Sequence, residues 1–437
     1  MKNKKVLIFG LGLNQGGVGS TVFFAKQGAE IKVTDLKSEK ILKLSLNQLK
    51  KYKNISYTLG EHKYEDIDWA DIIIRNPAIK DNNPYLKYAL EKGKKVETDF
   101  SIFLNFADKK KMIAVTGTKG KSTTASLIYE ILKTAGRKVV FAGNIGKSIL
   151  DTVPYLAENP WIVVEISSFQ LQALKDKNFA PYIAIITNIY PDHLNWHTSM
   201  EEYIKAKKLI AIYQTENDYL FLRKDDPITI GEDFLSGIKA KIIYYSKNDL
   251  PKDFHPKLLG EHNLENIAAA FAISKTLDLA SQVNDPGRSQ ALQVLKDFSG
   301  VEFRLQLIYN EDGIKIYNDT AATSPDAGIK ALETFPDCVL ICGGMNKKMD
   351  YTKYASVIKE KAKKVYFLEG DSTEEIKKKL NIKKTYNDLE ELLKDVKKEV
   401  KSGDIILFSP AATSFNLFQN EFDRGRKFNE AVKKVFG

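Results

Sequence analysis

Residues 116–123 read TGTKGKST, and this stretch decides the fold of the middle of the chain. It follows the apolar run 112–115, which is typical of a short buried strand, and precedes residues 125–132, where apolar side chains recur at helical spacing. A strand, a glycine loop and a helix in this order predict a phosphate site. The reason is that glycines let backbone N–H groups and the first helical turn point at one anion.

The residues of this stretch are the candidate nucleotide-binding residues: Gly117, Thr118, Lys119, Gly120, Lys121, Ser122 and Thr123. Lys121 would place a positive charge between the outer phosphates, and the hydroxyl of Ser122 or Thr123 suits Mg²⁺. The spacing G-x-x-x-x-G-K-[ST] would require glycine where the chain has Val115, so only the shorter TGTxGKST form is present. An ordinary glycine turn is the alternative, and the flanking strand and helix favour nucleotide binding.

The composition of the 437 residues, 28% charged and 43% hydrophobic, is that of a globular protein with two to four domains. A formal charge of +10 would suit a nucleic-acid partner, but only seven of the 66 basic residues are arginine. The lysines are spread over segments such as 359–364 and 377–379, which we expect to be helical. Solvated lysine faces explain the charge, and we predict no nucleic-acid binding.

The two cysteines, Cys338 and Cys342, share one apolar run, and their spacing on a strand does not suit a disulfide. The basic and apolar N-terminus, residues 2–9, imitates a signal peptide but breaks at Gly10 and Gly12, so we read it as a first strand. No apolar run approaches the roughly 18 residues needed to span a membrane. We expect a cytoplasmic protein without membrane insertion.

Residues 1–98 alternate strand and helix signals. The predicted elements are a strand (6–9), a glycine-rich turn (10–19), a helix (21–27), a second strand (30–34) and a further strand (71–74). Asp35, an acid after the second strand and about 20 residues past the glycines, is typical of dinucleotide binding. The third glycine of that motif is replaced by Gln15. The pattern favours a Rossmann-like domain that holds a nucleotide other than NAD, with NAD as the alternative.

The alternation restarts at the phosphate loop and continues to about residue 299. Strands are predicted at 138–142, 162–166 and 183–188, each with polar residues at its C-terminal end. Because open α/β sheets bind ligands at that edge, the three clusters point to one site. Glu165 closes an apolar strand, which favours a Mg²⁺ ligand over a helix cap. His193 could equally be structural, and composition does not single out Lys207 from Lys205 and Lys208 on the helix expected at 200–212.

The fold class follows as α/β with three domains. We expect an N-terminal Rossmann-like domain (1–98), a central P-loop ATPase domain with a mostly parallel sheet (99–299) and a C-terminal Rossmann-like domain (300–437). The third domain is predicted from strands at 314–318, 339–342, 364–368 and 404–408.

Further motifs occur in order along the chain. They are GNIG at 143–146, EISSFQL at 165–171, NIYPDHL at 188–194, YIKAK at 203–207, GEHNLEN at 260–266, DTAATSPDA at 319–327 and SPAATSF at 409–415. Together with TGTKGKST they resemble the Mur ligases over essentially the whole chain. The resemblance is strongest to the members that add D-glutamate to UDP-N-acetylmuramoyl-L-alanine, and it implies ATP-dependent amide formation through an acyl phosphate in peptidoglycan precursor synthesis.

The resemblance also implies roles for individual residues. Substrate binding falls to Asn14, Gln15, Asp35, Lys37, Asn144, Lys347 and Ser414. ATP contacts beyond the loop fall to Asn263, Asn266, Arg304 and Asp319, with the two asparagines toward adenine. Catalysis is expected of Lys121, His193 and Lys207, and Mg²⁺ binding of Ser122, Glu165, His193 and, if it is carbamylated, Lys207. The family further implies a monomer.

The amino-acid pocket departs from the family pattern. Where the family has DSKATN, the chain has DTAATS, so a lysine becomes Ala321; Phe422 is shifted by one position; and Gln306 replaces a glutamate. The identity and chirality of the amino acid therefore stay open, with L-glutamate or another residue as alternatives to D-glutamate. Two further classes of protein compete with this interpretation: the folylpolyglutamate synthases, which resemble TGTNGKGS instead, and a non-catalytic nucleotide-binding module.

Overall fold

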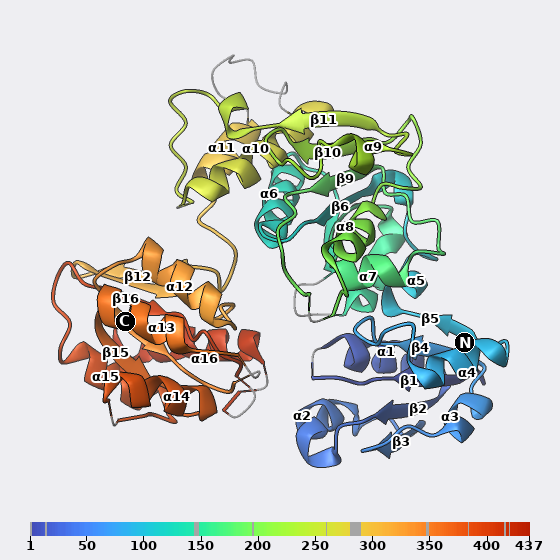
Figure 1. Cartoon of the computed structure of the whole chain (residues 1–437), viewed down its shortest axis with the longest axis horizontal. Helices are drawn as coiled ribbons and strands as arrows, with labels where there is room; N and C mark the ends of the chain where they lie inside the picture. The colour runs from blue at the N-terminus through green and yellow to red at the C-terminus, as the bar shows by residue number, and fades with distance from the viewer. Residues whose placement is uncertain are drawn as a thin grey trace. The chain divides into compact units, whose positions relative to one another are not determined.

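The computed structural model describes residues 2–13, 15–143, 148–194, 196–258, 260–279, 290–346, 349–382, 384–414, 417–418 and 420–437. The chain divides into two compact units, Met1–Phe298 and Ser299–Gly437. The first unit holds two sheets and the second holds one, each covered by helices (Figure 1). The predicted α/β fold class is confirmed.

The first sheet has the strand order β3-β2-β1-β4-β5 and is parallel throughout. Its strands are β1 (Lys5–Phe9), β2 (Glu30–Asp35), β3 (Ile55–Leu59), β4 (Ile72–Arg75) and β5 (Lys95–Glu97). Its helices are α1 (Gln15–Lys26), α2 (Glu39–Leu49), α3 (Tyr64–Trp69), α4 (Pro84–Glu91) and α5 (Asp99–Phe103). Val6 and Ile8 of β1 pack in one core cluster and Leu7 and Phe9 in another, because helices cover both faces of the sheet.

The glycine-rich turn expected at 10–19 is shorter than predicted, since α1 already begins at Gln15 and contains Gly16, Gly17 and Gly19. Close packing explains two of these helical glycines, Gly17 and Gly19. A Cβ atom on Gly17 would lie 2.1 Å from the carbonyl oxygen of Leu11, and one on Gly19 would lie 2.1 Å from the Cβ of Ser148. The glycines therefore allow the helix to approach its neighbours and do not extend the turn.

The second sheet has the order β11-β10-β9-β6-β8-β7 and is also parallel throughout. Its strands are β6 (Met112–Thr116), β7 (Val139–Gly143), β8 (Trp161–Glu165), β9 (Ile183–Ile186), β10 (Tyr219–Arg223) and β11 (Lys241–Tyr245). Its helices are α6 (Lys121–Thr134), α7 (Ser168–Ala173), α8 (Met200–Lys208), α9 (Glu232–Leu235), α10 (Glu261–Thr276) and α11 (Gln290–Asp297), with short 3₁₀ segments at Lys109–Lys111, Ile149–Glu158 and Lys247–Asp249. The helix expected at 200–212 ends at Lys208. Strand β6 is fully buried at the centre of the sheet, so the loop that leaves it has a fixed base.

The third sheet, in the second unit, has the order β12-β13-β16-β14-β15, and only β12 runs antiparallel to its neighbour. Its strands are β12 (Gln306–Glu311), β13 (Ile314–Asn318), β14 (Cys338–Cys342), β15 (Ala362–Phe367) and β16 (Ile405–Phe408). Its helices are α12 (Pro325–Thr334), α13 (Thr352–Lys361), α14 (Asp371–Leu380), α15 (Leu389–Lys397) and α16 (Glu421–Val435).

One lysine-rich segment differs from the prediction. Helix α13 ends at Lys361, and β15 begins at Ala362, two residues before the strand predicted at 364–368, so that Lys363 and Lys364 belong to the strand and not to a helix. The buried residues Tyr366 and Phe367 pair this strand with β14, which overrides the helical character of the lysines. Among the described helices, none is both long and apolar enough to cross a bilayer.

Candidate active site

The phosphate loop, residues 117–120, connects β6 to α6. Gly117 has φ +145° and Gly120 has φ +84°, conformations that side chains strongly disfavour. Space is also lacking: a Cβ on Gly117 would lie 1.9 Å from Thr187 Oγ1, and one on Gly120 would lie 2.2 Å from Asn266 Oδ1. Both positions require glycine, for the backbone conformation and for the close approach of neighbouring side chains.

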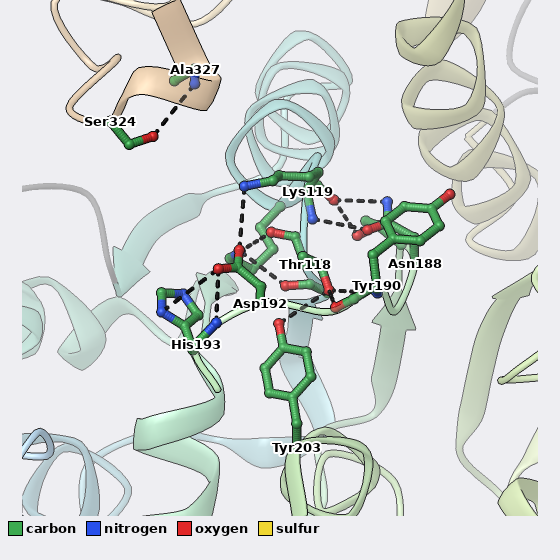
Figure 2. A network of polar contacts seen from close by, with 12 residues as sticks. Thr118, Lys119, Asn188, Tyr190, Asp192, His193, Tyr203, Ser324 and Ala327 are labelled. Atoms are coloured by element: carbon green, nitrogen blue, oxygen red, sulfur yellow. Dashed lines mark hydrogen bonds and ion pairs between the residues drawn. The ribbon is translucent and has the colours of Figure 1, made fainter. Parts of the chain in front are cut away.

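The segment after β9 holds this loop in place. The backbone N–H of Lys119 donates to Asn188 Oδ1 (2.9 Å), Asn188 Nδ2 donates to the carbonyl of Lys119 (3.0 Å), and Thr187 Oγ1 donates to the same carbonyl (2.6 Å). The N–H of Thr118 donates to the carbonyl of Asn188 at 2.9 Å (Figure 2). Sequence patterns did not assign Asn188 a role, although its place just after an apolar strand was a usable signal.

Thr118 and Lys119 carry the loop's side-chain contacts with the same segment. Thr118 Oγ1 donates to the carbonyl of Tyr190 (3.2 Å) and lies 3.1 Å from the hydroxyl of Tyr203, while Lys119 Nζ lies 3.3 Å from Asp192 Oδ2 (Figure 2). Partial burial acts to raise the pKa of Asp192, but Lys119 and His193 outweigh burial and the pKa is lowered. Asp192 therefore stays ionised beside the loop.

Lys121 folds back over the loop. Its Nζ donates to the carbonyls of Gly117 and Thr118, each at 2.9 Å. These contacts place the ammonium group beside the backbone that would surround the phosphates. The position suits the charge neutralisation expected of this lysine.

Glu165 and Ser122 form a pair at the end of β8. Ser122 Oγ donates to Glu165 Oε2 at 2.6 Å, and Glu165 is 2% exposed. A hydroxyl beside a buried carboxylate is an oxygen-only donor set of the kind that Mg²⁺ prefers. In the part of the chain that the structure describes, no three His, Cys, Asp or Glu side chains gather into a metal site. Mg²⁺ usually takes one or two protein ligands together with phosphates and water, so the pair fits that ion.

Lys207 stands apart from the other lysines of α8. It is 1% exposed, its Nζ donates to the carbonyl of Gly117 at 2.8 Å, and it lies 4.6 Å from the centre of the Tyr203 ring. Burial, with a further contribution from the charge of Lys121, holds the pKa of Lys207 well below its ordinary value. Lys205, by contrast, is exposed. The lowered pKa favours the neutral amine of Lys207, which is the nucleophilic form.

His193 lies in the same region, in a loop with φ +55° at this residue. Burial lowers its pKa, as do Lys121 and Lys207, and Asp192 opposes this. Its ring centre lies 5.1 Å from that of Phe169. The imidazole is therefore neutral near pH 7 and can offer a lone pair to a cation.

Asn263 and Asn266 belong to α10. Asn266 Nδ2 donates to Asn263 Oδ1 at 2.8 Å, and Asn266 Oδ1 accepts from Thr124 Oγ1 at 3.3 Å. Asn266 also limits the space at Gly120. The first unit thus brings together the loop, Glu165, His193, Lys207 and Asn266.

The candidate residues of the first sheet lie around the end of β2. Asp35 is 3% exposed and accepts from the N–H of Gly12 (2.8 Å) and the N–H of Lys37 (2.9 Å), and Lys37 Nζ lies 3.6 Å from the same carboxylate. Gln15 opens α1. Asp35 therefore joins the glycine turn to the end of β2. Two further candidate residues, Asn14 and Asn144, lie outside the described residues.

The second unit places Asp319 at the end of β13. Its carboxylate accepts from Ser409 Oγ (2.7 Å) and from the N–H of Leu305 (3.2 Å). Burial raises the pKa of Asp319 to about 7, although these two hydrogen bonds and the charge of Arg304 oppose the rise. Arg304 is exposed.

Ser414 is 2% exposed, and its hydroxyl makes no hydrogen bond among the described residues, which leaves it able to bind a ligand. Lys347 lies outside the described residues.

Arg424 of α16 is a residue whose role the sequence patterns did not indicate. It is fully buried, and its guanidinium donates to Thr320 Oγ1 (2.8 Å), the carbonyl of Thr320 (2.9 Å) and the carbonyl of Ala412 (3.0 Å). Burial lowers its pKa to about 9, against the opposing charges of Glu421 and Asp319. It joins the loops that leave β13 and β16. Its sequence signal was its place in the stretch 420–425, which resembles a family motif but was given no role.

Three family descriptions match consecutive parts of the chain. "Mur ligase MurD-like, N-terminal domain" matches residues 4–98, "Mur ligase middle domain" matches residues 115–257, and "Mur ligase, glutamate ligase domain" matches residues 303–412. Each match covers one of the three sheets.

Curated relatives match over the full length. The UDP-N-acetylmuramoylalanine–D-glutamate ligase of Borreliella burgdorferi is 37% identical over 458 residues, covering 100% of this chain and 99% of the relative. The ligase of the same name from Roseiflexus sp. is 34% identical, with 99% of each chain covered. A solved MurF ligase from Thermotoga maritima, in complex with ADP, has a TM-score of 0.56 at 19% identity and covers 99% of this chain and 96% of its own, a likeness of fold.

Proposed function

The chain belongs to the Mur ligase family, and we propose that it joins UDP-N-acetylmuramoyl-L-alanine to D-glutamate in peptidoglycan precursor synthesis, converting ATP to ADP and phosphate. The observation that carries the proposal is full-length identity of 33–37% to relatives named for this reaction. The arrangement around the phosphate loop supports it, since the residues expected to act on ATP contact one another in the first unit.

Electrostatic repulsion between the two substrates opposes transfer of the γ-phosphoryl group. ATP and the carboxylate of the muramoyl substrate are both anions, so the γ-phosphoryl group moves only if the charge of the transition state is neutralised. Lys121 lies against the phosphate loop and supplies a positive charge, while the loop N–H groups and the start of α6 supply aligned dipoles. The activated carboxylate is an acyl phosphate, which the amine of the incoming amino acid attacks with loss of phosphate.

Ser122 and Glu165 would hold Mg²⁺, with His193 and a carbamylated Lys207 toward a second ion. The oxygen donors of the first pair and the neutral imidazole of His193 fit that role. Bound Mg²⁺ would offset the negative charge of the phosphates. Lys207 fits a carbamate because its amine has a lowered pKa, and a neutral amine reacts with CO₂ to give an anion.

The three domains divide the substrates between them in this proposal. Residues 1–98 would bind the UDP part through Gln15, Asp35 and Lys37, and residues 99–299 would bind ATP. Residues 300–437 would bind the amino acid, with Ser414 among its ligands and Arg304 and Asp319 directed to ATP. The proposal treats the protein as a cytoplasmic monomer without a nucleic-acid partner.

Phosphate release from ATP tests the function. The purified chain would receive UDP-N-acetylmuramoyl-L-alanine with D-glutamate, L-glutamate or other amino acids in separate reactions, with each component omitted in turn as a control. We expect release with D-glutamate only. Release with another amino acid alone would replace the substrate assignment, and release with none would reject ligase activity.

A further inference from the structure

Tyr190 is an exposed aromatic residue inside the active site that the proposed mechanism does not use. It is 42% exposed, yet it lies between Asn188, which holds the phosphate loop, and Asp192, which pairs with Lys119. Figure 2 shows its ring pointing away from Asp192 and His193, on the other side of the loop. A large exposed ring beside a phosphate site raises the question of what covers it.

The backbone of Tyr190 is fixed to the phosphate loop. Its N–H donates to Thr118 Oγ1 at 3.0 Å, and the same hydroxyl donates to its carbonyl at 3.2 Å. Thr118 is itself tied to the carbonyl of Asn188. The backbone of Tyr190 therefore keeps a fixed offset from any phosphate that the loop binds.

Arg223 lies over the ring of Tyr190. It ends β10, the neighbour of β9 in the sheet, and its guanidinium carbon lies 5.9 Å from the centre of the Tyr190 ring. Arg223 is in turn held by Asp225, at 2.6 Å from its Nε. A ring supported in this way loses little conformational entropy when a ligand packs against it.

We propose that Tyr190 provides the stacking surface for the adenine base of ATP, which makes it a specificity-determining residue of the nucleotide site. The inference rests on the proposed function, because it takes ATP as the nucleotide. Amides such as Asn263 and Asn266 can hydrogen-bond to the edge of a base, whereas an aromatic ring covers its face, so the two roles are complementary. The ring distinguishes nucleotides from polyphosphates without a base.

The test compares two ligands and four proteins. Affinities for ATP and for inorganic tripolyphosphate, both with Mg²⁺, would be measured by calorimetry for wild type, Tyr190→Leu, Tyr190→Phe and Tyr155→Leu. Tyr155 is a matched control, a 65% exposed tyrosine of the Ile149–Glu158 segment. Thermal melting would verify that all four proteins are folded.

Stacking predicts that Tyr190→Leu weakens ATP binding about tenfold and leaves tripolyphosphate binding unchanged. Tyr190→Phe should retain most of the ATP affinity, and Tyr155→Leu should match wild type. Equal loss for both ligands, or no loss for either, would overturn the inference while leaving the proposed function intact. If wild type bound tripolyphosphate but not ATP, both the inference and the proposed function would fall.

Discussion

The phosphate loop of the first unit and the loops after β13 and β16 in the second unit solve different problems. The phosphate loop is fixed by backbone hydrogen bonds and by glycines that have no room for a side chain. The loops of the second unit are joined by buried side chains, through the hydrogen bonds of Arg424 and the Ser409–Asp319 pair, and carry the family departure at Ala321. Under the proposed function, the comparison would mean that phosphoryl transfer uses a fixed backbone, whereas amino-acid recognition varies by side chain on loops that buried side chains hold.

We expect the largest effect on activity from Lys121→Ala, at the phosphate loop. Removing the charge at the phosphates should lower phosphate release on the order of 10³-fold, with thermal stability close to wild type because Lys121 is only half-buried at the first residue of α6. Steady-state phosphate release and thermal melting check this. Lys133→Ala, at an exposed lysine in the last turn of α6, is the control. Retained turnover in Lys121→Ala would reject the phosphate site.

Asp319→Asn should change how the second unit responds to pH. The folded carboxyl keeps its proton up to about pH 7, whereas the unfolded one loses it near pH 4, so folding binds more protons in that window. The free energy of unfolding therefore falls as pH rises from about 4 to 7, by about 4 kcal/mol at most. Asparagine removes this titration, and urea unfolding at several pH values should show a flatter profile.

The exposed Asp312→Asn serves as the control for that experiment and should leave the pH profile of wild type unchanged. A profile for Asp319→Asn that parallels wild type would contradict the raised pKa.

Arg424→Met tests the clamp in the second unit. Two carbonyl oxygens, on Thr320 and Ala412, would lose their buried donor, and we expect a loss of about 3 kcal/mol in stability confined to this unit. Hydrogen exchange resolved by peptide would locate the loss, and unchanged exchange in peptides of the first unit would show that the loss is confined to the second. The neighbouring exposed Arg426→Met should be neutral, and equal behaviour of the two variants would argue against the clamp.

Ala321→Lys would sharpen the comparison by restoring the lysine of the family pattern. One charge-assisted hydrogen bond to a carboxylate is worth about 1.5 kcal/mol, so the KM for the amino acid should fall about tenfold while the KM for ATP stays constant. Kinetics with D-glutamate and L-glutamate measure this. An unchanged KM would show that another group already fills the role of the missing lysine.

Sequence patterns predicted the α/β fold and most of the central strands, because buried parallel strands are continuous apolar runs. They did not predict β3, β5, β10, β11 or β12, and they extended the glycine turn into α1. Gly17 and Gly19 serve tertiary packing there, which one-dimensional patterns do not report.

Among the candidate site residues, Lys207 shows why structure was needed. On α8 it is one lysine among several, and the family resemblance alone marked it in the sequence; its burial and its contact with the carbonyl of Gly117 give the physical reason. Arg424 stands in the stretch 420–425 that resembles a family motif, but its role was not predicted because its partners lie 12 and 104 residues away in the chain.

The two glycines of the phosphate loop have a consequence for inhibitor design. Any other residue at Gly117 or Gly120 would collide with Thr187 or Asn266 and would adopt a disfavoured backbone conformation. Escape mutations at these two positions would damage the loop before they disturbed a bound drug. A compound that contacts mainly this stretch of backbone would therefore bind at positions where few substitutions are tolerated.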